Sequence, residues 1–288
     1  MLRSISTKLF PRHISGTVAP RTSAAAFHSN AALKDQMSRA EVSGKRFWKT
    51  AGVKDMGGTA RYPINLNHVA VTLDGRVLKT PGSNKLTLPK EQKYLAMLIA
   101  GEWQGQKELL KPHTLPMTSL VARAIDGFIG NEQHRTETLN RLVKYLDTDS
   151  ICYQQSFPDS IVKAQEEHWN PILEWVKNEY GLDIKVSQGI TYVQQDEPTK
   201  QKLRDIVNSM TDIELAAFER ATMTAKSFLI GLAVVKRRLS VEEGWKASSL
   251  EVLDQIDRWG EVEDSHDVDR EFIKSQLASA RLVNVGTD

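Results

Sequence analysis

The stretch that decides the fold is Glu214–Val235, with the sequence ELAAFERATMTAKSFLIGLAVV. It is apolar on nearly every side of the helix that it would form, and such a helix is stable only where other elements cover it. We therefore expect one helix over Asp212–Arg237 at the centre of a helical bundle. Its most apolar part, Phe228–Val235, has eight residues, whereas a membrane-spanning helix needs about 20. We expect no transmembrane segment.

Amphipathic periodicity predicts further helices on both sides of this stretch. They cover Pro89–Gln106, Met117–Phe128, Glu132–Leu146, Ser160–Tyr180, Lys200–Ser209, Val241–Arg258 and Ser265–Leu282. Pro171 should kink or split its helix, because proline removes a backbone donor, and Gly181 should end that helix. Asp159 is a candidate N-cap for the same helix. Two extended pieces, Ser150–Gln154 and Asp183–Val193, complete the pattern.

Strand patterns precede all of these helices. Phe47–Leu88 contains short runs rich in Val, Thr and Leu, which glycine or Asp-Gly turns separate. In VAVTLDGRVLKT, Asp74-Gly75 joins two alternating runs, as a type I′ hairpin requires. Gly57–Asn67 is expected to be a longer excursion between strands. The fold class is therefore α+β, with a small antiparallel β domain over residues 46–88 and a larger, mostly α-helical domain over residues 89–288.

The first 34 residues differ in composition from the rest of the chain. They hold five Lys and Arg residues and many Ser, Thr and Ala, and the first acid is Asp35. This is typical of a mitochondrial targeting peptide, whereas a secretory signal needs an apolar core that is missing here. Residues 35–45 read as a linker. Without the leader, 33 Lys and Arg stand against 36 Asp and Glu, which gives no reason to expect nucleic-acid binding.

The chain carries a strong negative charge near its end, where Ser240–Phe272 has 11 acids and three bases. Within this region lies Ser248–Asp269, SSLEVLDQIDRWGEVEDSHDVD. Its apolar residues recur at spacings of three and stop at Gly260, which predicts a partly buried helix with one apolar face. That face consists of Leu250, Leu253, Ile256 and Trp259.

Three interpretations of this acidic run stay open. It is a solvated face, a surface that binds a partner, or a metal site, because carboxylates attract hard cations and a histidine adds a transition-metal ligand. The candidate metal ligands are Glu261, Glu263, Asp264, His266, Asp267 and Asp269. Their spacing does not match an EF-hand, which needs a glycine at its sixth position and a glutamate at its twelfth.

Other motifs of enzyme chemistry are weak or missing. The sequence contains no G-x-x-x-x-G-K-[ST], G-x-G-x-x-G or G-x-S-x-G pattern, so it gives no support for nucleotide chemistry or a nucleophile elbow. Cys152 is the one cysteine, which excludes an internal disulfide, and its apolar neighbours predict a buried thiol. Lys144, Asp147 and Asp149 are either acid–base groups or groups that end and cap helices.

Five tryptophans occur at helical spacing among apolar residues, which favours core positions for all of them. They are Trp103, Trp169, Trp175, Trp245 and Trp259. Trp103 and Trp259 are the alternative candidates for anchoring a partner, because aromatic residues dominate the energetics of interfaces.

Several segments together resemble one protein family. They are RFWKTAGV (46–53), LDGRVLKTPGSNKLTLP (73–89), AGEWQGQ (100–106), MTSLVARAID (117–126), KYLDTDSICY (144–153), HWNPILEWVKNEYG (168–181) and RLSVEEGWKASSLEVLDQIDRWGEVEDSHD (238–267). In this order they resemble the mitochondrial F1-ATPase assembly factor family, the chaperones of the F1 α subunit. The segments KYLDTDSICY and RWG-x-x-E-x-x-HD are the most telling.

The resemblance implies a mitochondrial matrix chaperone that binds the unassembled F1-ATPase α subunit and promotes assembly of the F1 sector. It implies no catalysis and no cofactor. The short apolar runs of the sequence predict no stable membrane insertion, and we expect a monomer. The candidate partner contacts are Glu251, Trp259, Glu261, Glu263, His266 and Asp267, with Trp103 as a further candidate. The alternatives are a metal-dependent hydrolase that uses Glu263–Asp269, or a stable structural subunit of a mitochondrial complex.

Overall fold

The structure, a computed structural model, describes residues 44–56, 67–188 and 191–285. The predicted leader, most of the predicted linker and all but the last residue of the predicted excursion Gly57–Asn67 lie outside the described residues.

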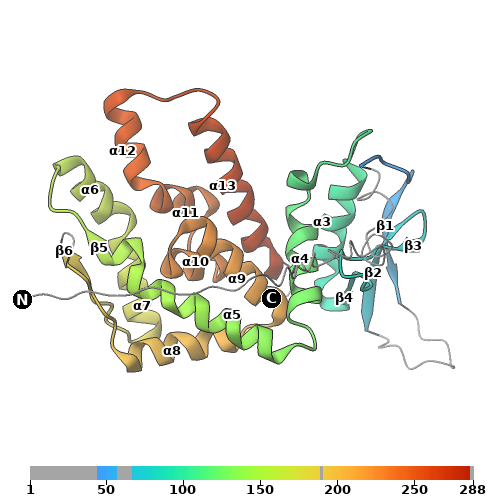
Figure 1. Ribbon diagram of the computed structural model, residues 1–288, viewed down its shortest axis with the longest axis horizontal. Coiled ribbons are helices and arrows are strands. Elements are labelled where there is room, and N and C mark those ends of the chain that lie inside the picture. The colour runs from blue at the N-terminus through green and yellow to red at the C-terminus, as the bar shows by residue number, and fades with distance from the viewer. Residues whose placement is uncertain (1–43, 57–66, 189–190, 286–288) are drawn as a thin grey trace, which may run out of the picture.

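A four-stranded antiparallel sheet forms the N-terminal part of the described chain, as the sequence predicts (Figure 1). Its strands are β1 (Ala51–Asp55), β2 (His68–Leu73), β3 (Arg76–Val77) and β4 (Thr87–Pro89). The central strand β2 pairs with β1 along one edge, where Ala51 lies opposite Leu73. Along its other edge β2 pairs first with β3 and then with β4, with Ala70 opposite Thr87.

The predicted hairpin turn lies between β2 and β3. Asp74 and Gly75 have φ angles of 47° and 77°, and positive values at both positions define a type I′ turn. The Asp74 carboxylate also accepts hydrogen bonds from the backbone N–H groups of Lys49 (3.0 Å) and Thr50 (2.9 Å). The bond from Thr50 is the main cause that lowers the pKa of Asp74. The turn is thus tied to the segment that enters β1.

Helix α3 (Lys93–Gln104) packs on the sheet. The rings of Trp48 and Trp103 lie 5.0 Å apart, and Trp103 Nε1 donates to Thr118 Oγ1 at 3.0 Å. Glu102 then caps the next helix, α4 (Pro116–Gly127), because its carboxylate accepts from the backbone N–H groups of Met117 and Thr118. The first helix of the helical part therefore joins the sheet to the rest of the molecule.

The remaining helices form the larger part of the fold, and α9 and α10 lie among the others in its middle (Figure 1). They are α5 (Glu132–Lys144), α6 (Asp159–His168), α7 (Asn170–Tyr180), α8 (Glu197–Asn208), α9 (Asp212–Ala225), α10 (Phe228–Val235), α11 (Val241–Ser248), α12 (Leu250–Trp259) and α13 (His266–Arg281). A two-residue parallel pair, β5 (Tyr153–Gln154) with β6 (Ser187–Gln188), occupies part of the predicted extended pieces. The α+β fold class is confirmed.

The central helix is broken, so the prediction of one helix over Asp212–Arg237 is wrong. Lys226 has a φ of 53°, which ends α9, and Ser227 Oγ accepts from Ile230 N–H at 3.0 Å, which starts α10. The two helices pack closely at Gly231, where a larger residue would not fit: a Cβ there would lie 2.6 Å from Thr222 Oγ1. The predicted burial is correct, since every residue of α10 is buried.

Two other predicted helices are also divided. The helix with Pro171 ends at His168 and resumes as α7, and Gly181 closes α7 with a φ of 64°. Both outcomes match the prediction. Asp159 is not the N-cap, because Pro158 holds that position and Asp159 is the first residue of α6. The helix predicted over Val241–Arg258 is divided into α11 and α12.

Nearly all buried apolar residues of the described chain form one cluster that reaches from Trp48 to Val283 and so includes both the sheet and the helices. The division into domains between residues 88 and 89 stays a prediction. Among the described residues, no helix combines the length and apolar character that crossing a membrane requires.

Candidate functional site

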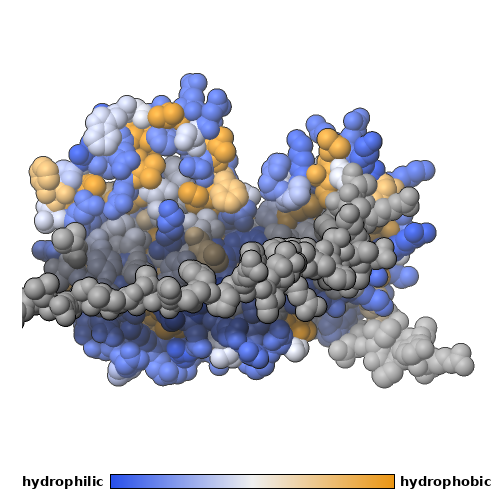
Figure 2. All heavy atoms as spheres, viewed as in Figure 1, coloured by the Kyte–Doolittle hydropathy of each residue, from blue (hydrophilic) through white to orange (hydrophobic). Residues whose placement is uncertain are grey.

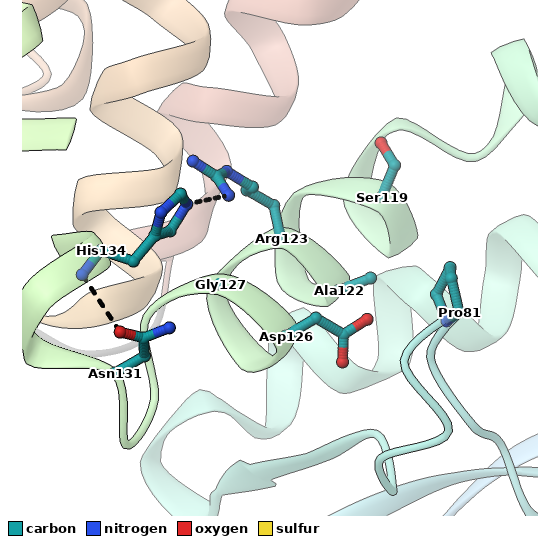
Figure 3. Close-up of a pocket in the computed structure, with 8 residues that line it drawn as sticks. All are labelled: Pro81, Ser119, Ala122, Arg123, Asp126, Gly127, Asn131 and His134. Atoms are coloured by element: carbon teal, nitrogen blue, oxygen red, sulfur yellow. Dashed lines mark hydrogen bonds between the residues drawn. The ribbon is translucent and has the colours of Figure 1, made fainter. Parts of the chain in front are cut away.

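Three groups of polar side chains are candidate sites. The first lines an open hollow of about 500 Å³ between α4 and the loop that carries Pro81 (Figure 3). Asp126 points from α4 toward that loop and accepts from Thr80 Oγ1 (2.6 Å), Gly82 N–H (2.8 Å) and Asn84 Nδ2 (2.8 Å). The segments TPGSN and ARAID of the resemblance therefore meet here, and the carboxylate serves to join the sheet to α4.

Next to this hollow lies a buried carboxylate that the sequence analysis did not single out. Glu219 of α9 accepts from Arg123 Nε at 2.8 Å, and it also pairs with Arg141. Arg123 in turn lies 3.0 Å from His134 Nε2 (Figure 3). A glutamate within the apolar run ELAAFER is the signal that could have drawn attention to it. A charge taken out of water needs opposite charges around it. The two arginines supply them from α4 and α5, so the ion pairs connect these helices to α9.

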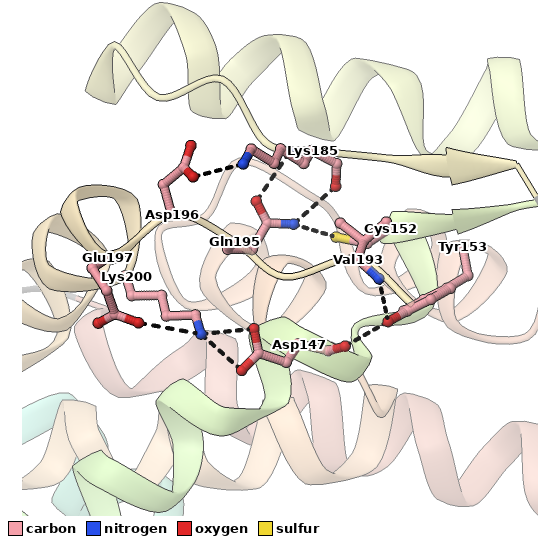
Figure 4. Close-up of polar contacts among 9 residues, drawn as sticks. All are labelled: Asp147, Cys152, Tyr153, Lys185, Val193, Gln195, Asp196, Glu197 and Lys200. Carbon is pink, nitrogen blue, oxygen red and sulfur yellow. Dashed lines mark hydrogen bonds and ion pairs between the residues drawn. The ribbon is translucent and has the colours of Figure 1, made fainter. Parts of the chain in front are cut away.

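The second group belongs to the segment KYLDTDSICY (Figure 4). Lys200 of α8 lies 2.9 Å from Asp147, and the Tyr153 hydroxyl donates to the Asp147 carbonyl at 2.6 Å. Gln195 Nε2 donates to the sulfur of Cys152, whose thiol is buried as predicted, and burial raises its pKa. Each of these groups is directed at another part of the same chain.

Asp149 is the clearest case of an internal role in this segment. Its side chain is fully buried and accepts from Ile151 N–H at 3.2 Å and from Leu229 N–H at 3.0 Å, at the start of α10. Burial raises its pKa to about 6. Lys144 is the last residue of α5. The interpretation of Lys144, Asp147 and Asp149 as groups that end and cap helices is thus supported over an acid–base role.

The third group is the C-terminal arm, which we define as residues 250–272: helix α12, the connection 260–265 and the first half of α13. The two helices stand side by side at one end of the helical part, and the connection joins their outer ends (Figure 1). Only the first of the four predicted apolar residues is fully buried. Leu253 and Ile256 are half-buried, and Trp259 is 76% exposed. The expectation of a core position for Trp259 is therefore wrong, because α12 extends beyond the elements that cover its beginning.

Hydrogen bonds and an ion pair fix the connection between the two helices. Gly260 ends α12 with a φ of 89°, a conformation that side chains rarely adopt. Val262 N–H donates to His266 Nδ1, and His266 N–H donates back to the Val262 carbonyl, both at 3.1 Å. Arg270 of α13 pairs with Glu261 at 2.8 Å. The connection is held to α13, and His266 is occupied by a backbone contact.

A cleft of about 220 Å³ lies between the two helices of the arm. Its walls carry Leu253 and Ile256 from α12 and Ile273 from α13, and Trp245 of α11 contributes to its lining. Lys274 lies over the Trp245 ring at 4.2 Å. The lining of the cleft therefore combines apolar side chains with charged ones, which include Glu261, Asp269 and Arg270.

The predicted site residues in the arm lie in different settings. Glu251 accepts from Gln155 Nε2 at 3.0 Å, and Glu263 is exposed. Asp267 is half-buried at the start of α13, where a carboxylate favours the helix N-terminus, and its Oδ1 has no hydrogen-bond partner within the described residues. In the part of the chain that the structure describes, no three His, Cys, Asp or Glu side chains are placed to hold a metal ion.

Trp103 does not belong to this surface. Its side chain is 1% exposed and lies between the sheet and α4, so the core position is observed and a partner cannot reach the ring in this conformation. By contrast, the arm exposes more than half of several apolar side chains besides Trp259. They are Val262, Val268 and Phe272. Figure 2 shows apolar residues among hydrophilic ones over α12 and α13.

An exposed tryptophan, neighbouring apolar side chains and a dense set of carboxylates are features of a surface that binds other proteins.

The family model of the ATP12 chaperone protein matches residues 45–177. The chain is 33% identical over 251 residues to the protein atp12, mitochondrial, of Schizosaccharomyces pombe, which covers 85% of this chain and 83% of the relative. The chain belongs to the ATP12 chaperone family.

Further relatives agree with this assignment. The protein ATP12, mitochondrial, of Saccharomyces cerevisiae is 27% identical over 320 residues, which cover 98% of this chain and 95% of that protein. The crystal structure of Atp12 from Paracoccus denitrificans has a TM-score of 0.71 at 27% identity, over 85% of this chain and 99% of that one. A putative chaperone from Agrobacterium tumefaciens, Atu1473, gives a TM-score of 0.72 at 25% identity, over 87% and 93%.

Proposed function

We propose that this protein is a chaperone of the mitochondrial matrix that binds the unassembled F1-ATPase α subunit and promotes assembly of the F1 sector. Family membership supports the chaperone role, and two relatives are named as mitochondrial proteins. The observation that carries the proposal is the C-terminal arm, where Trp259 is 76% exposed within a strongly acidic surface.

The physical reason is the nature of an orphan subunit. Interfaces of obligate oligomers bury about 2,000 Å² or more and are unusually apolar, so an unassembled subunit tends to aggregate. A chaperone for such a surface needs apolar side chains for affinity, and charges that speed the encounter while leaving the complex exchangeable. The arm offers both. We propose that the chaperone covers this surface until the β subunit takes its place.

The proposed contacts are those residues of the arm that the sequence analysis selected. They are Glu251, Trp259, Glu261, Glu263, His266 and Asp267. We place Trp259 at the centre, because exposed aromatic residues contribute most to binding, and the acids around it. We further propose that the protein acts as a monomer by stoichiometric binding, without a cofactor, and that residues 1–34 direct it to the matrix.

Affinity purification from mitochondria in which assembly of the β subunit is blocked tests this proposal. The tagged protein should retain the α subunit in a one-to-one complex, and the finished ATP synthase should not contain it. Trp259→Ala should lose the α subunit. Tyr192→Ala is the matched control, because this aromatic side chain is 63% exposed but lies outside the arm.

Other outcomes would favour the alternatives. Migration with the finished ATP synthase at one copy per enzyme would indicate a structural subunit. A stoichiometric metal ion in the purified protein, lost in a variant with Asp267→Asn and His266→Ala, would indicate a hydrolase. Failure to retain the α subunit from the blocked mitochondria would exclude the proposed partner.

A further inference from the structure

The cleft between α12 and α13 presents apolar surface that is not among the contacts proposed above. The cleft opens between these two helices, and its walls carry Leu253, Ile256 and Ile273, which are half-buried. Val252, on the same side of the opening, is 42% exposed. Neighbouring helices usually close such a gap with their own side chains, so the walls present apolar surface that the arm itself does not cover.

The charge around the cleft selects what can fill it. The arm contains nine acids against two bases. Both bases are already engaged, because Arg258 pairs with Asp254 at 2.9 Å and Arg270 with Glu261 at 2.8 Å. Glu261 and Asp269 line the cleft together with Arg270, and the excess of acids lies on the surface of the arm around it. An acidic segment would be repelled by this surface and a basic one attracted to it. Lys226 lines the cleft as well, where the short break between α9 and α10 lies.

We propose that the cleft receives a large apolar side chain from a basic segment of the captured subunit, with Lys or Arg beside that side chain. This inference rests on the proposed function and specifies the chemistry of the contact. The apolar side chain packs between Ile256 and Ile273, and the neighbouring cations face the carboxylates at the mouth. Trp259 and the apolar residues of the connection extend the contact on the outside of the arm.

A single-cysteine cross-linking experiment tests the cleft. Cys152 is the only cysteine in the sequence and is buried with a raised pKa, so a thiol introduced at the surface reacts selectively. Val252→Cys places a benzophenone label at the cleft, and Tyr192→Cys places the same label on an exposed position that does not line the cleft. The labelled proteins are mixed with unassembled F1 α subunit, irradiated, and the cross-linked peptides are identified by mass spectrometry.

The cleft label should cross-link at least about tenfold more α subunit than the control label, as expected for a buried central contact. The cross-links should fall in one segment with Lys or Arg beside a large apolar residue. Loss of capture by the labelled Val252→Cys protein alone would also support occupation of the cleft. Equal cross-linking from both positions with normal capture, or cross-links to an acidic segment, would overturn the inference and leave the proposed function standing. No capture by the unlabelled protein would instead contradict the proposed function.

A second pair of variants gives an independent readout. Ile256→Ser should weaken binding of the α subunit at least about tenfold, and Ile129→Ser, at an exposed apolar residue between α4 and α5, should leave it unchanged. Raising the salt concentration should lower the association rate of the parent protein, because screening weakens attraction between exposed charges. Unchanged affinity of the Ile256→Ser variant, with its circular dichroism spectrum preserved, would contradict a role of the cleft.

Discussion

The segments KYLDTDSICY and RWGEVEDSHD look alike as sequences, since each combines acids, two in the first and four in the second, with aromatic or apolar residues. In the structure they differ completely. Asp149 of the first is fully buried and accepts from two backbone N–H groups, one of them 80 residues away. Trp259 of the second is 76% exposed, and the acids around it mostly face solvent. A polar motif has a structural role where its side chains are buried against other parts of the chain, and it is available for binding where its side chains face solvent.

The largest expected effect is a loss of stability when Asp149 of the segment KYLDTDSICY is replaced. Asp149→Ala should lower the free energy of unfolding by roughly 3 kcal/mol or more, because it leaves buried N–H groups at the start of α10 without an acceptor. Asp149→Asn keeps one acceptor oxygen and should cost less. Urea denaturation followed by circular dichroism measures both. A loss below about 1 kcal/mol in the alanine variant would remove the contrast between the two segments.

The next effect lies in the arm and concerns binding. Trp259→Ala should change the free energy of unfolding by less than about 1 kcal/mol, because the ring is mostly in water. It should weaken capture of the α subunit by about 2 kcal/mol, or roughly 30-fold, as expected for an aromatic hot spot. Isothermal calorimetry and urea denaturation separate the two quantities. A large loss of stability would show that the ring is structural after all.

A pH dependence sharpens the comparison further. The pKa of Asp149 is raised from 3.8 to about 6, so the folded state favours the neutral acid. Its contribution to stability is present below pH 3.8 and is lost as the pH rises through about 6. The free energy of unfolding of the parent protein, minus that of Asp149→Asn, should therefore fall between about pH 4 and about pH 7. A constant difference would show that Asp149 is ionised throughout.

The smallest effect is electrostatic. Glu263→Lys should slow association with the α subunit a few-fold at low salt and leave the unfolding transition unchanged, because exposed charges affect encounter more than stability. Glu197→Lys, whose side chain is 82% exposed on α8, is the matched control. Stopped-flow measurements at two salt concentrations compare the variants. Equal slowing by both substitutions would indicate an effect of net charge and no special role of the arm.

The sequence predicted the regular elements well where one pattern repeats. Alternation around Asp74-Gly75 gave the hairpin, and the apolar run Glu214–Val235 gave the buried centre of the helical part. The break at Lys226 escaped prediction, because apolar periodicity does not report a positive φ at a lysine. Ser227, which caps α10, is a residue type that favours the start of a helix, but the long apolar run around it favoured one continuous helix.

The candidate site was predicted only in outline. Local spacing placed Trp259 on the same helix face as Leu250, but burial depends on which elements cover each end of α12, and that is a tertiary property. The network of Glu219 with Arg123 was missed for a similar reason, since 96 residues separate the two side chains. The cleft could not be predicted either, because its walls come from helices whose separation no sequence pattern describes.

The contact between Asp149 and Leu229 also has a consequence for the order in which the protein is made. A chain that emerges from the ribosome presents Asp149 some 80 residues before the amide that it must bind. The sheet and α3 can assemble from contiguous sequence during that interval, whereas the segment around Asp149 has to wait. Synthesis that stops before residue 229 should therefore yield a fragment with an intact N-terminal sheet and an exposed, protease-sensitive middle.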